Sequence, residues 1–452
     1  MGLAGETQHD ETVGFTSQMS AARQRPWLIP FVVVIGVSFC ARLLFVVVTS
    51  PVWWPDSIGY MQLARLIGRG NLAAGQGIRT PGYPLFMLLN DFNLSAIRAT
   101  QMIMGLAITS GIFWIIWTLN HKPWLASLGA LLYGLSIAQV RLESFILTET
   151  LATAFLLGAL VSLVSLRTSQ RRDWWKLLAM GVFAGLLPLV RPLYVFVPLL
   201  FAIPVASVVS LRSRRFWLYF LPAIRPVVVW VGYLGVTFDY VGLQTASGFG
   251  WTNHAGAFMK DAPQRYATIR DIYLRHEATH RGQVINTIWS SIPDMQKATG
   301  QTYPELSETV QSLSFTLIAS HPVGYARQVA TAFVGFWKGL SIDKTWNPLG
   351  TLTGPIWRLC RYLWLLVSFC FVVVVLGLLA TRLHLIPLPE LPSPTGWMVL
   401  TVLISGILQA LVEYGSATRF GMPTQPFVSV VVMLALGAWV TGRRRQQRPP
   451  TP

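Results

Sequence analysis

Residues 28–49 read LIPFVVVIGVSFCARLLFVVVT, the first long apolar run of the chain. A helix of this length is about 33 Å long, which is enough to cross the roughly 30 Å hydrocarbon core of a bilayer. The 22 residues that open the chain are polar, and no small-residue cleavage site follows the apolar run. We therefore expect this run to be a retained signal anchor and the first transmembrane helix.

The composition extends this interpretation to the whole chain. Of 452 residues, 53% are hydrophobic and only 12% are charged, against about 25% charged residues in ordinary soluble domains, which excludes a soluble enzyme. We predict an all-α polytopic membrane protein with about ten transmembrane helices, within a range of about nine to twelve. The predicted spans are residues 28–49, 97–119, 123–140, 145–166, 176–190, 193–211, 216–237, 357–380, 397–413 and 424–441.

The formal net charge of +17 is interpreted by the position of the basic residues. Arginine and lysine favour the cytoplasmic side of short loops, and the dense clusters alternate consistently if both termini are cytoplasmic. The clusters are short and are explained by topology, so we expect no nucleic-acid partner. They comprise Arg23 and Arg25; Arg167, Arg171, Arg172 and Lys176; Arg212, Arg214 and Arg215; and Arg443, Arg444, Arg445 and Arg448.

This orientation predicts a domain organisation in the plasma (inner) membrane, most consistent with a bacterium. A cytoplasmic tail (1–27) precedes an N-terminal transmembrane module (28–237), whose first outer loop is residues 50–96. A mixed or helical extracytoplasmic segment (238–356) precedes the C-terminal transmembrane helices (357–441) and a basic cytoplasmic tail (442–452). A short outer loop near residues 141–144 joins the third and fourth spans. The site should lie in these outer segments.

The first outer loop contains PDSIGYMQLARLIGRG at residues 55–70 and RTPGYPLF at residues 79–86. Apolar residues at 60, 63, 64 and 67 have the spacing of a helix lying on a surface. We expect Asp56 to be the N-cap of that helix. Capping alone would explain an isolated aspartate, whereas a position at the mouth of a membrane pocket favours a functional role.

These motifs resemble the first extracytoplasmic loop of GT-C glycosyltransferases, in the branch of protein O-mannosyltransferases and lipid A aminoarabinose transferases. The resemblance rests on Asp56 after the first span, Tyr60 four residues on, and the Arg79-Thr80-Pro81-Gly82-Tyr83-Pro84 stretch. Weaker matches are Leu147–Leu151, Gly185–Pro192 and Tyr414–Phe420 with Pro423 and Pro426. Many relatives have two adjacent acids where this chain has Asp56 and Ser57, and an Arg-Tyr pair where it has Arg419 and Phe420.

The resemblance implies a GT-C-like fold and transfer of a sugar, with inversion, from a polyprenyl-phosphate donor to an acceptor hydroxyl on the extracytoplasmic face. The acceptor hydroxyl needs a general base, and we assign that role to Asp56. The lipid phosphate leaving group needs positive charge, which arginine supplies with a bidentate fork. The candidate phosphate ligands are Arg79, Arg191, Arg419 and Lys338; each of them alone is also explained as an interfacial anchor.

The family places a second functional acid near the second outer loop. Glu143 and Glu149 are the candidates, and a surface pair between Glu143 and Arg141 is the alternative for the former. Tyr60, Tyr83, Asn253 and His254 are candidate pocket-lining residues. The resemblance is compatible with three classes of acceptor: a lipid, a glycan or a protein.

The long outer segment contains His276 and His280, whose spacing puts two rings on one helix face. No His-Glu-x-x-His pattern accompanies them, so a solvated face is favoured over a zinc site. We predict no cofactor and assign no metal ligand; a divalent metal stays open as an alternative that the ligand spacing does not support. Residues 320–338 have the pattern of an amphipathic helix on the membrane surface, starting at a cap.

Two other functions are compatible with a chain of this layout. An O-antigen-type polymerase or ligase has a similar number of spans and a long outer loop, but it does not need an acid directly after the first span. A transporter or lipid flippase would show inverted repeats and broken helices near the midplane. A nucleotide-sugar enzyme is disfavoured because the chain has no phosphate-cradling glycine motif.

Overall fold

The computed structural model describes residues 25–168, 173–280, 284–338, 350–386, 389–414 and 417–446. These residues form helices and no strands; an isolated bridge joins Val52 to Phe145. The N-terminal half contains α2 (Leu28–Val48), α3 (Pro55–Gly68), α4 (Gly82–Leu89), α5 (Leu94–Asn120), α6 (Pro123–Gly134), α7 (Ile137–Leu142), α8 (Glu149–Thr168), α9 (Trp174–Val190), α10 (Val197–Ala206) and α11 (Arg214–Phe238). The expected tail 1–27 and basic tail 442–452 lie largely outside the described residues.

The remaining helices belong to residues 238–356, the predicted outer segment, and to the C-terminal part. The outer segment contains α12 (Ser247–Gly250), α13 (Thr252–Ala255), α14 (Ala267–Thr279), α15 (Val284–Thr299), α16 (Tyr303–Ser320) and α17 (Pro322–Trp337). The C-terminal part contains α18 (Gly350–Arg382), α19 (Pro394–Val412), α20 (Ala417–Phe420) and α21 (Gln425–Gln446). The described part of the outer segment is therefore helical rather than mixed.

Among the described residues, seven helices are long and apolar enough to cross a membrane, judged by length and composition: α2, α5, α8, α11, α18, α19 and the helical stretch that includes α21. The predicted spans at 176–190 and 193–211 correspond to shorter apolar helices. The span predicted at 123–140 does not form one helix: α6 ends at Gly134, and Ser136 takes an extended conformation with ψ of 109° before α7 begins. The apolar pattern continues across this break because both short helices bury apolar side chains.

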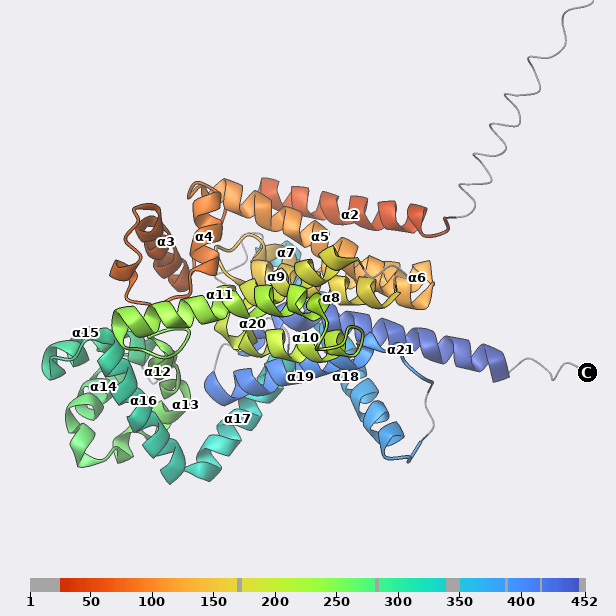
Figure 1. The fold of residues 1–452 in the computed structure, drawn as a ribbon. Coiled ribbons are helices and arrows are strands. Elements are labelled where there is room, and N and C mark those ends of the chain that lie inside the picture. The colour runs from red at the N-terminus through yellow and green to blue at the C-terminus, as the bar shows by residue number, and fades with distance from the viewer. Residues whose placement is uncertain are drawn as a thin grey trace, which may run out of the picture.

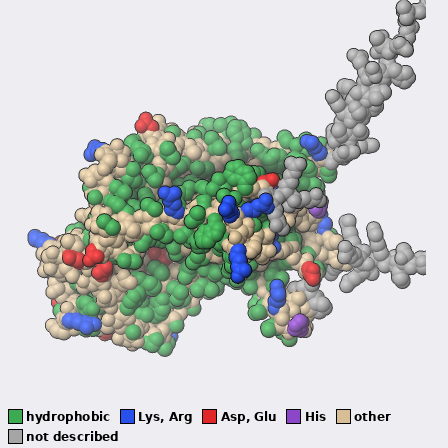
Figure 2. Space-filling model, viewed as in Figure 1, with side chains coloured by type: hydrophobic (Ala, Val, Ile, Leu, Met, Phe, Trp, Pro, Cys, Tyr) green, Lys and Arg blue, Asp and Glu red, His purple; other side chains and the backbone are tan. Residues whose placement is uncertain are grey.

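The arrangement separates a polar end from an apolar body. In Figure 1, α3 and α12–α16 lie at one end of the helix bundle, and the first residues of α2 and the last of α21 lie at the other. Figure 2 shows hydrophobic side chains over much of the middle of the molecule, with several Lys and Arg side chains among them. Helices α12–α16 have a hydrophobic cluster of their own, which includes Phe249, Tyr273 and Leu313.

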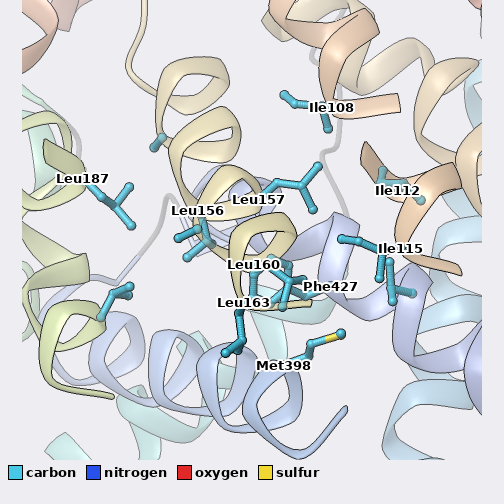
Figure 3. Packing of buried hydrophobic residues seen from close by; sticks show 14 of the residues in the cluster. Ile108, Ile112, Ile115, Leu156, Leu157, Leu160, Leu163, Leu187, Met398 and Phe427 are labelled. Carbon is cyan, nitrogen blue, oxygen red and sulfur yellow. The ribbon is translucent and has the colours of Figure 1, made fainter. Parts of the chain in front are cut away.

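The main core surrounds α8. Leu156, Leu160 and Leu163 of this helix are fully buried and lie among side chains of α5, α9, α19 and α21 (Figure 3). Because α8 is apolar on several faces, it packs inside the bundle rather than at its lipid-facing surface. Its first residue, Glu149, is thereby carried into the interior at the same end as α3.

Two glycines let α9 and α11 approach closely. Gly181 and Gly185 are four residues apart on α9, and a Cβ on either would overlap a carbonyl oxygen of α11, that of Tyr219 or Pro222 respectively. Small residues at this spacing bring membrane helices into backbone contact. This contact sets the position of the C-terminal end of α9, from which Arg191 extends.

We predict that Gly181→Ala and Gly185→Ala each destabilise the protein by about 1–3 kcal/mol, because the added methyl group forces the two helices apart. The measurement is the thermal unfolding midpoint of purified protein in one detergent. The matched control is Gly36→Ala on α2, where an added Cβ meets no atom within 4 Å and alanine is the better helix former. Equal midpoints for all three variants would contradict this packing.

Candidate active site

Asp56 is the second residue of α3 and is not its N-cap. Trp54 is the N-cap: the Ser57 hydroxyl accepts a hydrogen bond from the Trp54 backbone N–H at 2.9 Å and donates one to the Ile146 carbonyl at 2.8 Å. The expected capping role of Asp56 is therefore wrong. Its carboxylate lies in the first turn, where the helix dipole favours negative charge, and it is left to make tertiary contacts.

Both carboxylate oxygens of Asp56 are held by arginines. Arg79 Nη2 lies 2.8 Å from Oδ1, and Arg419 Nη2 lies 3.0 Å from Oδ2. Burial on its own would raise the pKa of Asp56, but the two guanidinium groups outweigh it, so the pKa lies below its ordinary value. Asp56 is therefore ionised at neutral pH.

Glu149 continues the same chain of charges. Its Oε1 lies 3.0 Å from Arg419 Nε and 3.3 Å from Arg191 Nη1, and its side chain is only 3% exposed. Arg419 thus bridges Asp56 and Glu149. The structure brings together three of the four predicted phosphate ligands and two predicted acids in one alternating row, here called the arginine cluster: Arg79, Asp56, Arg419, Glu149 and Arg191.

Proline-containing turns explain how two of these arginines reach the cluster. Arg191 is the C-cap of α9 and has an extended conformation (φ −147°, ψ 101°), as the following Pro192 requires. Arg79 precedes Pro81 and Gly82, and a Cβ at Gly82 would lie 2.6 Å from the carbonyl oxygen of Leu189. The glycine therefore allows the start of α4 to contact the end of α9.

The outer segment also fixes the Arg79 loop. The Thr245 hydroxyl donates to the Gln76 carbonyl at 2.7 Å, and the Thr245 backbone N–H donates to the Gly77 carbonyl at 3.0 Å. Ile78 packs against the hydrophobic cluster of α12–α16. Arg79 is thus held between the membrane helices and the outer helices.

Aromatic rings support the guanidinium groups. The Phe420 ring lies under both Arg191 and Arg419, at 4.6 and 4.8 Å from ring centroid to guanidinium carbon, and Tyr60 lies 5.1 Å from Arg79. Such contacts stabilise a cation over a ring face. Tyr83 stacks edge-on against Tyr60 and donates to the Gln101 side chain at 2.9 Å, so it lies beneath the cluster rather than in it.

Glu143 lies apart from the arginine cluster, in a buried ion pair. Arg42 of α2 donates to it twice, from Nε at 2.8 Å and Nη2 at 2.6 Å, and both side chains are at most 2% exposed. The expected alternative, a surface pair with Arg141, is wrong, because both residues are buried and Glu143 pairs with Arg42. The lone arginine within the first span was the signal for this partner.

A further acid that sequence reasoning missed, Glu413, lies within electrostatic range of the arginine cluster. It follows the last residue of α19 and accepts a hydrogen bond from Asn253 Nδ2 at 2.8 Å. His254, next to Asn253, is fully buried and contacts the Ala410 carbonyl and the Gln328 side chain, each at 3.0 Å. The only sequence signal was an acid directly before the Tyr414–Phe420 stretch.

The remaining predicted residues lie outside the cluster. Lys338 is exposed, one residue after the end of α17, with its backbone N–H bonded to the Gly335 carbonyl.

His276 contacts Ser290 and Asp294 of α15, and His280 contacts Ser290. Ser320 ends α16 rather than capping α17. Within the described ranges, no group of three or more His, Cys, Asp or Glu side chains is arranged to hold a metal ion.

Comparison of the chain with protein-family models, with curated proteins and with solved structures finds no match. The site is therefore interpreted from its own geometry and charge.

We predict that Glu143→Gln destabilises the protein by about 3–5 kcal/mol, because it leaves the Arg42 guanidinium buried without its carboxylate. The double variant Arg42→Met with Glu143→Met should recover most of the lost stability, since it removes both charges. Thermal unfolding midpoints in detergent measure both effects. A Glu143→Gln protein as stable as wild type would show that this ion pair does not hold α2 in place.

Proposed function

We propose that this protein is an integral membrane glycosyltransferase that moves a sugar from a polyprenyl-phosphate donor to an acceptor hydroxyl, with inversion at the sugar. The observation that carries the proposal is the arginine cluster: three guanidinium groups and an ionised Asp56 at one end of an apolar helix bundle. Convergent arginines at such a boundary suit a lipid-linked phosphate. A GT-C-like fold, an extracytoplasmic site and a plasma-membrane location belong to the same proposal.

The charge of the cluster favours a monophosphate donor. Within the cluster, three guanidinium groups and two carboxylates leave one net positive charge; the nearby Glu413 adds a negative charge above about pH 7. A sugar phosphodiester carries one negative charge and would neutralise the cluster, whereas a pyrophosphate-linked donor carries more negative charge than the cluster balances. This favours the transferase over an O-antigen-type polymerase or ligase, and the one-sided position of the cluster favours it over a transporter or flippase.

In the proposed reaction, the donor phosphate and Asp56 compete for the same guanidinium groups. When the phosphate engages Arg79 and Arg419, it loosens their hold on Asp56, whose carboxylate is then available to accept the proton of the acceptor hydroxyl. The hydroxyl oxygen bonds to the anomeric carbon, the bond from that carbon to the phosphate oxygen breaks, and its electron pair stays on the phosphate. The arginines stabilise the charge that develops there. No metal ion takes part in this proposal.

We predict that Asp56→Asn, which keeps the shape and removes the base, lowers kcat at least about a hundredfold. The assay measures free polyprenyl phosphate released from polyprenyl-phospho-sugars by protein in nanodiscs with membrane-extract acceptors. The matched control is Asp271→Asn, at a carboxylate of α14 whose side chain is 59% exposed, which should retain full activity. Full activity in Asp56→Asn would remove the base from this proposal.

We further predict that Arg419→Lys lowers donor turnover about tenfold or more while the protein stays folded, because lysine keeps the charge but cannot bridge two carboxylates and a phosphate with a planar fork. The same assay and the thermal midpoint measure this. Release of polyprenyl phosphate that is unchanged in both Arg419→Lys and Arg79→Lys would contradict a phosphate role for the cluster.

A further inference from the structure

Asn253 and Glu413 form a second polar group beside the arginine cluster. Asn253 belongs to α13 and Glu413 follows α19, and the 2.8 Å hydrogen bond between them joins the outer helices to the membrane helices. Glu413 is close enough to Arg419, Asp56 and Arg191 to interact electrostatically with all three. The pair therefore lies within electrostatic range of the arginine cluster.

The pair is held in place from two sides. His254 contacts the Ala410 carbonyl at 3.0 Å, and the Tyr325 hydroxyl donates to the Leu411 carbonyl at 2.8 Å. These contacts use the carbonyl groups at the end of α19 that have no partner within the helix. The backbone that carries Glu413 is thus fixed without any contact to the carboxylate itself.

Hydrogen-bonding capacity remains unused at both side chains. Asn253 is only 5% exposed, yet no polar atom in the described part of the chain lies within hydrogen-bond reach of its Oδ1. Glu413 forms no ion pair with any residue in the described ranges, although it is close to two arginines. Buried side-chain oxygens are nearly always partnered, so the unused Asn253 oxygen, which is adjacent to a carboxylate, indicates a ligand.

The chemistry of the two side chains restricts that ligand. An amide oxygen and a carboxylate both accept hydrogen bonds, so the ligand must donate at least two. A cationic ligand is disfavoured, because Arg419 and Arg191 lie near. A neutral polyol with neighbouring hydroxyl groups meets both conditions.

We propose that Asn253 and Glu413 bind hydroxyl groups of a sugar. This inference rests on the proposed function in that the sugar would lie next to the donor phosphate. Two sources of the bound sugar fit this chemistry: the sugar of the donor and a sugar of the acceptor. In either case the pair selects for hydroxyl groups and acts separately from Asp56, which accepts the proton.

The ionisation of Glu413 gives the subsite a pH dependence. Burial raises the pKa of Glu413 to about 7, while Arg419, Arg191 and the hydrogen bond from Asn253 lower it and Asp56 raises it. The neighbouring His254 has a pKa below its ordinary value because it is buried, and so it stays neutral at this pH. A carboxylate accepts hydrogen bonds more strongly than a carboxylic acid, so sugar binding should weaken as the pH falls through about 7.

Saturation-transfer NMR of full-length protein in nanodiscs tests the subsite without requiring turnover. The probes are methyl glycosides of mannose, glucose and arabinose, titrated at pH 8 and pH 6. We expect one of them to bind wild type, to bind less tightly at pH 6, and to lose at least tenfold in affinity in both Glu413→Gln and Asn253→Ala. The matched control, Glu308→Gln at an exposed position of α16, should bind as wild type does.

Two additions to the titration identify the source of the sugar. Saturating the protein with polyprenyl-phospho-sugar should displace a glycoside that occupies the donor-sugar position, whereas a glycoside in the acceptor position should still bind. Unglycosylated polyprenyl phosphate should leave either glycoside bound. Thermal midpoints of the variants, and Glu413→Asp as a conservative second variant that should bind more tightly than Glu413→Gln, separate lost binding from lost folding.

The outcomes for the subsite and for the proposed function are distinct. Absence of binding by every glycoside to wild type, or equal binding by wild type, Glu413→Gln and Asn253→Ala, overturns the sugar subsite even if the transferase assay succeeds. Specific glycoside binding that depends on these two residues supports the subsite even if no polyprenyl-phospho-sugar is consumed, which would overturn the proposed donor instead.

Discussion

The structure depends on the requirement that charges removed from water be paired. Removing a single carboxylate or guanidinium group from water costs several kcal/mol, and a partner must offset that cost. In the arginine cluster, each charge has a partner from a distant part of the chain: Asp56 lies in the first turn of α3, Glu149 begins α8, Arg191 is the C-cap of α9 and Arg419 belongs to α20. The ion pairs fix these ends relative to one another, while apolar packing around α8 fixes the bodies of the helices.

Much of the fold was predictable because bilayer-length apolar runs leave a simple signal. Apart from residues 123–140, each predicted span overlaps one α-helix, since hydropathy reports burial whether the surroundings are lipid or protein. The same property explains the failure at residues 123–140: α6 and α7 are both apolar, and the extended backbone at Ser136 that separates them has no hydropathy signal. Helix caps were less predictable, because α3 is capped by a hydrogen bond from the Trp54 backbone N–H to the Ser57 hydroxyl, which depends on the local geometry.

The site residues were predictable where an arginine stood close to a proline-containing turn. They were not predictable where the role of an acid depended on its partner in the folded structure. Arg79, Arg191 and Arg419 each stand near a proline, and they do converge. The sequence suggested the nearby Arg141 as the partner of Glu143. Sequence proximity gives no information about Arg42, which is 101 positions away. Glu413 is an isolated acid in the sequence. Its candidate role depends on the hydrogen bond that it accepts from Asn253 on another helix.

The two acids of the arginine cluster differ in a way that bears on the proposed reaction. The Glu149 side chain is 3% exposed and that of Asp56 is 26% exposed, so an incoming phosphate meets the Asp56 side of the cluster first. Displacing Glu149 would leave a buried carboxylate without its partners, whereas a displaced Asp56 remains near solvent. Phe420 lies against Arg191 and Arg419, so these two guanidinium groups keep a contact while their ion pairs exchange. Glu149 therefore acts as the fixed anchor of the cluster, and Asp56 as the carboxylate that the proposed donor releases.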